Sequence, residues 1–148
     1  CIRDRPHRCQ LVRKVTGVQY LDDSKGTNLG ATEAALIGLS SEGPIWLILG
    51  GQGKGQDFSP LRQVVSERCA GLLVLGQAAA EITDQLGRAA RIEQVDTVEE
   101  AVLRASRLAR SGDTVLLSPA CASLDMFSSY VERGERFQHA VQALEVAS

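Results

Sequence analysis

Short apolar runs alternate with helical segments along almost all of this sequence of 148 residues. The runs 44–49, 71–75 and 114–117 are each rich in Leu, Ile and Val, as is typical of strands buried on both faces of a sheet. The segment 97–109 instead carries apolar residues at helical spacing. Strands joined by helices pair in parallel, because each helix returns the chain to the same end of the sheet. The sequence therefore predicts a three-layer α/β fold with a mostly parallel sheet of about six strands.

Local signals predict further boundaries. The runs 9–15 and 18–21 flank Thr16-Gly17 and predict a hairpin, which adds one antiparallel strand. Ser59 is predicted to cap a helix, with Pro60 at the first helical position. Thr97 and Glu100 predict a capping box, in which each side chain satisfies a backbone N–H of the other residue.

Composition excludes several classes of protein. A net charge of −2, with 44% hydrophobic and 23% charged residues, indicates a globular domain and argues against nucleic-acid binding. The apolar run 45–49 is too short to span a membrane, so we expect no membrane partner. The four cysteines form no C-x-x-C pair, which argues against zinc and favours reduced thiols in the cytoplasm. The chain starts at Cys1 and not at Met, so we expect residues 1–8 to be a linker remnant and 9–148 one domain.

Ligands of parallel α/β sheets bind beyond the carboxyl ends of the strands, which directs attention to the loops there. The loop 22–28 holds two carboxylates, hydroxyls and Lys25 before a helix. A helix N-terminus beside a lysine favours an anion, and an Asp at a strand end can accept hydrogen bonds from a ribose. The alternative is a well-capped turn with solvated charges.

The glycine-rich loop 50–55 follows the most apolar strand and resembles a phosphate loop only superficially. A Walker A motif needs Gly where Ile48 stands and Ser or Thr where Gly55 stands. The dinucleotide fingerprint fails as well, because Gln56 replaces its third glycine. The loop therefore offers one lysine, Lys54, at a strand end; the alternative is a mobile surface loop.

The loop 118–125 is built of small residues, and Ser123 or Asp125 opens the helix that follows. Such a segment offers backbone N–H groups to a carboxylate or phosphate. Cys121 is a poor candidate for a nucleophile, because neither histidine of the chain lies in a strand-end loop. Arg133 and Arg136 near the start of the last helix add positive charge, or form a solvated basic turn. We expect anion binding here, with no metal site and no catalytic residue.

Several motifs occur together in one order: PHR at 6–8, DSKGTN at 23–28, GGQGK at 50–54, SPACASLD at 118–125 and RGERF at 133–137. This series resembles the C-terminal domain of the Mur ligases over residues 6–144. It is most similar to the members that add D-glutamate to UDP-N-acetylmuramoyl-L-alanine during peptidoglycan precursor synthesis.

The resemblance implies a Rossmann-like domain from a three-domain, monomeric, cytoplasmic enzyme. In that family ATP phosphorylates the L-alanyl carboxylate, and the amine of D-glutamate attacks the acyl phosphate. The P-loop and the Mg²⁺ ligands belong to the central domain, which is missing from this chain. The C-terminal domain closes over ATP and brings the amino acid, so alone it is expected to be inactive.

The same resemblance implies roles for individual residues. Residues at nucleotide-contacting positions are Arg8, Asp23, Lys25 and Thr27. Residues at D-glutamate-contacting positions are Lys25, Thr27, Lys54, Ser123, Leu124 and Tyr130. Asn28 and Arg133 are further candidates without an assigned role. Two positions depart from the family pattern, with Gly26 where Ala is usual and Tyr130 where Phe is expected.

Two alternatives remain open at this point. The chain is a domain of another Mur or folylpolyglutamate-type ligase, or a non-catalytic nucleotide-binding module. A ligase for a diamino acid would need acidic residues near Lys54, Ser123 and Tyr130. Perturbation of the strand-end loops by D-glutamate would favour a ligase over a docking module.

Overall fold

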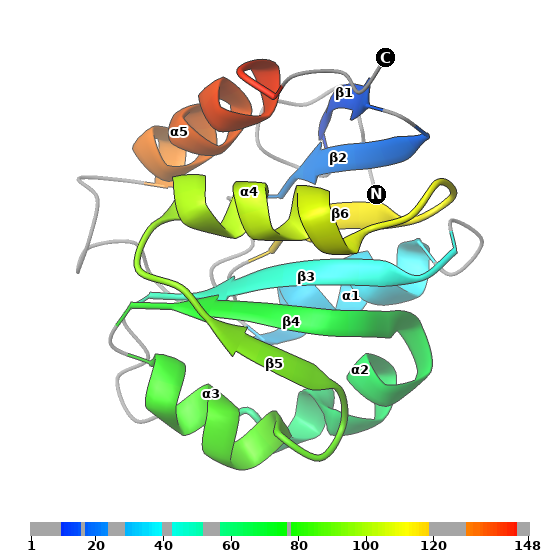
Figure 1. Cartoon of the computed structure of the whole chain (residues 1–148). Helices are drawn as coiled ribbons and strands as arrows, with labels where there is room; N and C mark the ends of the chain where they lie inside the picture. The colour runs from blue at the N-terminus through cyan, green and yellow to red at the C-terminus, as the bar shows by residue number, and fades with distance from the viewer. Residues whose placement is uncertain are drawn as a thin grey trace.

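A computed structural model describes residues 10–15, 17–23, 29–39, 43–51, 57–76, 78–118 and 130–144 (Figure 1). They form one six-stranded sheet with the strand order β1-β2-β6-β3-β4-β5. The strands are β1 (Gln10–Val15), β2 (Val18–Asp22), β3 (Ile45–Gly50), β4 (Cys69–Leu75), β5 (Arg91–Gln94) and β6 (Thr114–Leu117). The β1–β2 hairpin is antiparallel, and the other neighbouring strands pair in parallel. The predicted three-layer, mostly parallel α/β fold is confirmed.

Helices cover both faces of the sheet (Figure 1). One face carries α1 (Leu29–Gly38), α2 (Arg62–Arg68) with the short 3₁₀ turn η1 (Ser59–Leu61), and α3 (Ala79–Leu86). The other face carries α4 (Val98–Leu108) and α5 (Tyr130–Gln142). All six residues of β3 are buried, which explains why its sequence is apolar without alternation.

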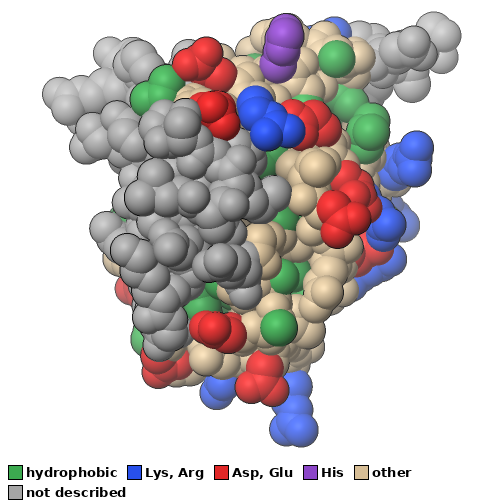
Figure 2. All heavy atoms as spheres, turned by 90° about the vertical axis from the view of Figure 1, so that its left-hand side faces the viewer, with side chains coloured by type: hydrophobic (Ala, Val, Ile, Leu, Met, Phe, Trp, Pro, Cys, Tyr) green, Lys and Arg blue, Asp and Glu red, His purple; other side chains and the backbone are tan. Residues whose placement is uncertain are grey.

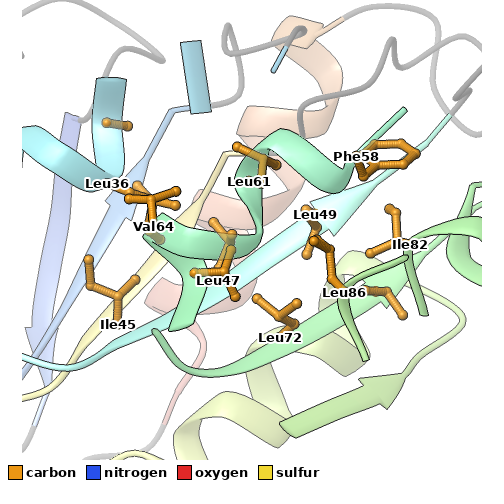
Figure 3. Close-up of a cluster of buried hydrophobic side chains, with 14 of the residues drawn as sticks. Leu36, Ile45, Leu47, Leu49, Phe58, Leu61, Val64, Leu72, Ile82 and Leu86 are labelled. Atoms are coloured by element: carbon orange, nitrogen blue, oxygen red, sulfur yellow. The ribbon is translucent and has the colours of Figure 1, made fainter. Parts of the chain in front are cut away.

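The side chains of β3 divide between two cores. Ile45, Leu47 and Leu49 join the cluster beneath α1, α2 and α3, which Figure 3 shows with Phe58 at its margin. Ile48 points the other way and joins the cluster under α4 and α5. Each fully buried aliphatic side chain of this kind contributes roughly 1.5–3 kcal/mol through its removal from water. The two cores therefore hold the helices against opposite faces of the sheet and fix the position of each strand end.

The helix starts confirm one sequence prediction and correct another. Thr97 caps α4, since its hydroxyl accepts the Glu100 N–H at 3.0 Å. The capping box predicts that the Glu100 carboxylate accepts the Thr97 N–H. It instead accepts the N–H of the preceding residue, Asp96, at 3.2 Å. The prediction that Ser59 caps a helix is wrong. Its hydroxyl donates to Asp57 at 2.9 Å, and η1 begins with no side-chain cap.

We predict that Gly50 at the end of β3 tolerates no side chain. Its φ is +130°, and a Cβ there would collide with the carbonyl oxygen of Leu75 on β4. Gly112 is the matched control, because its φ is +99° but a Cβ there meets nothing within 4 Å. Gly112→Ala should cost about 1–2 kcal/mol for the left-handed backbone alone. Gly50→Ala should cost at least roughly 3 kcal/mol, because collision is added to strain.

Urea unfolding of both variants, followed by circular dichroism, measures the two losses. Equal losses would show that the close approach of the β3 and β4 backbones is not a constraint.

Candidate functional site

The carboxyl ends of three neighbouring strands lie at one edge of the sheet. The sequence predicts the candidate ligand-binding loops at this edge. β6 lies between β2 and β3, so the ends of these strands are adjacent. Backbone bonds extend the pairing past the strands: Asp23 N–H donates to Leu117 at 2.8 Å, and Ser118 N–H donates to Ile48 at 3.2 Å. Figure 2 looks onto the side of the molecule where the parallel strands end. Asp23, Ser118 and Gly51 therefore stand next to one another as the last described residues before the candidate segments.

The two consecutive aspartates at the end of β2 face opposite sides of the sheet. Asp22 follows the alternation of Tyr20, which packs under α4 and α5. Asp23 follows the alternation of Leu21, which packs under α1. Both are buried, with 0% and 7% of their surface exposed. A buried carboxylate is stable only with hydrogen-bond donors around it, and the two sides of the sheet supply different ones.

On the α1 side, Asp23 belongs to a cluster with two hydroxyl side chains. The Ser118 hydroxyl donates to the Asp23 carboxylate at 2.9 Å, and Ser118 Oγ lies 3.1 Å from Thr32 Oγ1. The Thr32 hydroxyl donates to the Ser118 carbonyl at 3.2 Å. Ser118 and Thr32 are fully buried. The cluster joins the ends of β2 and β6 to α1.

On the other side, α5 is tied to the same edge. The Gln138 amide donates to the Asp22 carboxylate at 2.7 Å. Arg136 forms a two-pronged pair with Glu99 of α4, at 2.8 and 2.9 Å. At the far end of α5, the Arg13 guanidinium donates to three of the last carbonyls, including that of Leu144 at 3.1 Å. Because cations favour a helix C-terminus, Arg13 also offsets the helix dipole.

Arg133 lies inside the protein, with 1% of its surface exposed. Interpretation of this arginine as part of a solvated basic turn is therefore wrong. Arg136 is only partly buried and is engaged by Glu99. A buried guanidinium needs hydrogen-bond acceptors for its N–H groups. Arg133 is therefore part of the packed interior beneath α5 and not a surface charge.

Backbone hydrogen bonds hold the third strand end, that of β3. Gly51 N–H donates to the carbonyl of Leu75 at 3.1 Å, and Ala78 N–H donates to the carbonyl of Gly51 at 2.9 Å. These bonds tie the start of the glycine-rich segment to the end of β4 and to the start of α3. They fix the point from which the chain proceeds toward Lys54.

The described residues include Asp23, Arg133 and the backbone of Tyr130, which is the first residue of α5. The other candidate residues lie outside the described part: Arg8, Lys25, Thr27, Asn28, Lys54, Ser123 and Leu124. Their roles stay predictions, as does that of the Tyr130 side chain. Sequence reasoning missed Thr32 and Gln138 and did not single out Ser118 within its loop. Thr32 stands among small and apolar helix residues, and only its contact with Ser118 distinguishes it.

Cys69, the cysteine among the described residues, is not a candidate nucleophile for this edge. Burial raises the pKa of the Cys69 thiol to about 12, so it is protonated at neutral pH. Cys69 is also the first residue of β4, at the opposite end of the strand. Within the described ranges, no group of three or more His, Cys, Asp or Glu side chains could hold a metal ion. None of the helices described here is long and apolar enough to cross a membrane.

Comparison with known proteins identifies the family to which the chain belongs. The family model described as "Mur ligase, glutamate ligase domain" matches residues 7–121. This chain belongs to that family. It is 54% identical over 140 residues to the UDP-N-acetylmuramoylalanine–D-glutamate ligase of Pseudomonas savastanoi pv. phaseolicola, covering 93% of the chain and 31% of the relative. It is 51% identical over 146 residues to the enzyme of that name from Cupriavidus pinatubonensis, covering 98% and 29%. This Mur ligase domain therefore spans about a third of the length of these curated relatives.

Solved structures show the same fold at low sequence identity. The murein peptide ligase Mpl of Psychrobacter arcticus matches with a TM-score of 0.66 and 13% identity, over 95% of this chain and 31% of that one. The bifunctional folylpolyglutamate synthase/dihydrofolate synthase of Yersinia pestis matches with a TM-score of 0.66 and 20% identity, over 95% and 32%. The fold is thus common to ligases of different names, so it does not by itself distinguish between them.

We predict that the bond between Gln138 and Asp22 stabilises the docking of α5. Gln138→Ala should lower the free energy of unfolding by about 1.5–3 kcal/mol, as is usual for a hydrogen bond to a charged group. His139→Ala is the matched control on the same helix, because His139 is exposed. It should change stability by less than about 0.5 kcal/mol. Chemical denaturation of the two variants checks this, and a Gln138→Ala variant as stable as His139→Ala would contradict it.

Proposed function

We propose that this chain is the C-terminal domain of an ATP-dependent ligase that joins D-glutamate to UDP-N-acetylmuramoyl-L-alanine. The observation that carries the proposal is the identity of about 50% to ligases of that name over nearly the whole chain. The solved structures do not separate the two substrates, because the murein ligase Mpl and the folylpolyglutamate synthases are all at most 20% identical to the chain. The preference for the peptidoglycan substrate over folate therefore rests on the curated relatives alone.

The rest of the enzyme has to supply what this sequence lacks. No complete Walker A motif occurs in the chain, and the relatives are about three times as long as the part they share with it. We therefore place the P-loop, the Mg²⁺ ligands and the UDP-sugar site in the preceding domains. A related ligase was solved with AMPPNP and Mn, which supports a nucleotide and a divalent metal in the whole enzyme. The proposal locates the enzyme in the cytoplasm, where ATP is available, and treats it as a monomer.

Within this domain, the edge formed by β2, β6 and β3 has the chemistry for two anionic ligands. Asp23 follows β2 and would accept hydrogen bonds from the ribose of the nucleotide, which Arg8 would also contact. Lys25 and Thr27 follow Asp23 closely and would contact phosphate oxygens and D-glutamate. Because strand ends of open parallel sheets are where ligands bind, the described geometry supports this assignment.

D-Glutamate carries two carboxylates, which need separate partners. Lys54 would pair with one of them, and Ser123 with the backbone of Leu124 would hold the other. The ring of Tyr130 would line the pocket, and Asn28 and Arg133 would complete its polar surroundings. Charge-assisted bonds of this kind fix both ends of the amino acid, so that its amine meets the activated carboxyl carbon. The domain thus contributes position and charge, while bond formation needs no nucleophile from it.

A phosphate-release assay on the full-length protein tests the proposed reaction. Release from ATP should require both D-glutamate and UDP-N-acetylmuramoyl-L-alanine, with one amide formed per phosphate. Turnover with a folate and L-glutamate, but not with these two substrates, would replace the proposal with the folylpolyglutamate alternative. The 148-residue chain alone should release no phosphate, because the P-loop is missing; amide synthesis by this fragment would refute its assignment as a partial enzyme.

Lys54 provides a sharper prediction. In the full-length enzyme, Lys54→Ala should lower kcat/KM for D-glutamate roughly tenfold to hundredfold, since a charge-assisted bond contributes about 1.5–3 kcal/mol. The KM for ATP should stay nearly constant. Lys14→Ala is the matched control, because Lys14 is an exposed lysine on β1. Steady-state kinetics with each substrate varied in turn decide the question. Unchanged D-glutamate kinetics in the Lys54 variant would remove this lysine from the site.

A further inference from the structure

The buried cluster of Asp23, Ser118 and Thr32 joins three elements at the edge that the proposed function assigns to the nucleotide. Asp23 follows β2, Ser118 follows β6, and Thr32 lies in the first turn of α1. The separations are 2.9 Å from Ser118 Oγ to Asp23 Oδ2 and 3.1 Å from Ser118 Oγ to Thr32 Oγ1. All three residues are buried, but Asp23 keeps 7% of its surface exposed while the two hydroxyl residues keep none. Asp23 is thus the residue of the cluster that retains some exposure to solvent.

Each hydroxyl has a single proton, which limits which group in the cluster donates a hydrogen bond to which. Ser118 has one proton, and a carboxylate is the stronger acceptor, so this proton goes to Asp23. Thr32 also has one proton, which it donates to the carbonyl or to the hydroxyl oxygen of Ser118. Donation to the hydroxyl oxygen holds the Ser118 side chain in the rotamer that reaches Asp23, whereas donation to the carbonyl holds the main chain that carries this side chain. The chain of contacts therefore runs from Thr32 through Ser118 to the carboxylate.

The backbone reinforces this order. Asp23 N–H donates to Leu117 at 2.8 Å, and Ser118 N–H donates to Ile48 at 3.2 Å. The main chain on both sides of the carboxylate–hydroxyl bond is therefore fixed by neighbouring strands. An aspartate has two side-chain torsions, and the Ser118 bond restrains both by engaging Oδ2.

We propose that Ser118 and Thr32 are positioning residues that orient the Asp23 carboxylate for the hydroxyl groups of a nucleotide ribose. The proposal rests on the nucleotide contact assigned to Asp23 under the proposed function. Ser118 acts directly on the carboxylate, and Thr32 acts through Ser118. A pre-oriented acceptor binds its ligand more tightly, because less freedom is lost on binding.

The test measures ADP binding to the full-length protein by calorimetry and ATP kinetics in parallel. Ser118→Ala should weaken ADP binding roughly fivefold to twentyfold, which is less than the loss of a direct bond to a charged group, because the Asp23 carboxylate itself remains. Thr32→Val, which keeps the branched shape and loses the hydroxyl, should have a smaller effect in the same direction. Thr32→Ser restores the hydroxyl and should restore binding. The KM for ATP should rise in step with the dissociation constant, while the KM for D-glutamate stays unchanged.

A double-mutant cycle separates positioning from general destabilisation. In an Asp23→Asn background, Ser118→Ala should weaken ADP binding no further, because it acts through the carboxylate. Val115→Ala is the matched control, since Val115 is a buried residue of β6 that packs under α4 and α5. It should lower the melting temperature and leave ADP binding unchanged. An additive effect of Ser118→Ala in the Asp23→Asn background would overturn the proposal.

The remaining outcomes distinguish this proposal from the one on which it rests. If Asp23→Asn weakens ADP binding but Ser118→Ala and Thr32→Val do not, positioning is refuted and the nucleotide contact survives. If Asp23→Asn itself leaves ADP binding unchanged, the nucleotide contact of Asp23 fails and the positioning role fails with it. Thr32→Val preserves side-chain shape, so it decides the case even if Ser118→Ala does not fold.

Discussion

The insertion of β6 between β2 and β3 is the constraint on which the rest of the edge depends. β6 is the last strand along the chain, yet it pairs in parallel with both of these early strands. This arrangement places Ser118 beside Asp23, although they are 95 positions apart in the sequence. It also places both beside the end of β3, from which the glycine-rich segment follows. Without this pairing the three candidate segments would have no common edge.

Because side chains alternate between the two faces of the sheet along β2, the two adjacent aspartates have hydrogen-bond partners on opposite faces. Asp22 receives the Gln138 amide and so ties α5 to the sheet. Asp23 receives the Ser118 hydroxyl and so joins β6 and α1. A register shift of one residue in β2 would exchange the two carboxylates between faces and break both sets of contacts. The pairing of β2 with β6 therefore determines which carboxylate is available to a ligand on each side.

Much of this architecture could be predicted because it depends on local patterns. Apolar runs marked the buried strands, and the Thr97 cap followed from residues close in sequence. The errors arose where tertiary contacts decide. Serine is a residue type that often caps helices, but the Ser59 hydroxyl donates to the Asp57 carboxylate instead. Arginine is usually found on protein surfaces, but the position of α5 buries Arg133. The role of Thr32 was invisible for the same reason, because its partner Ser118 comes from a distant strand.

The titration behaviour of the described residues agrees with a domain that positions ligands. Burial raises the pKa of Tyr20 to about 12 and that of Cys69 to about 12, in each case by desolvation. Neither shift involves a charged partner. Tyr20 belongs to the core under α4 and α5, and the partly buried Cys69 packs against the other core, so the shifts report packing and not a tuned acid or base. The polar groups at the strand ends are instead joined by hydrogen bonds of fixed geometry. A site of this kind accelerates a reaction by holding reactants in place, which requires another domain to hold the second reactant. This chemistry is consistent with the proposed dependence of the domain on the rest of a ligase.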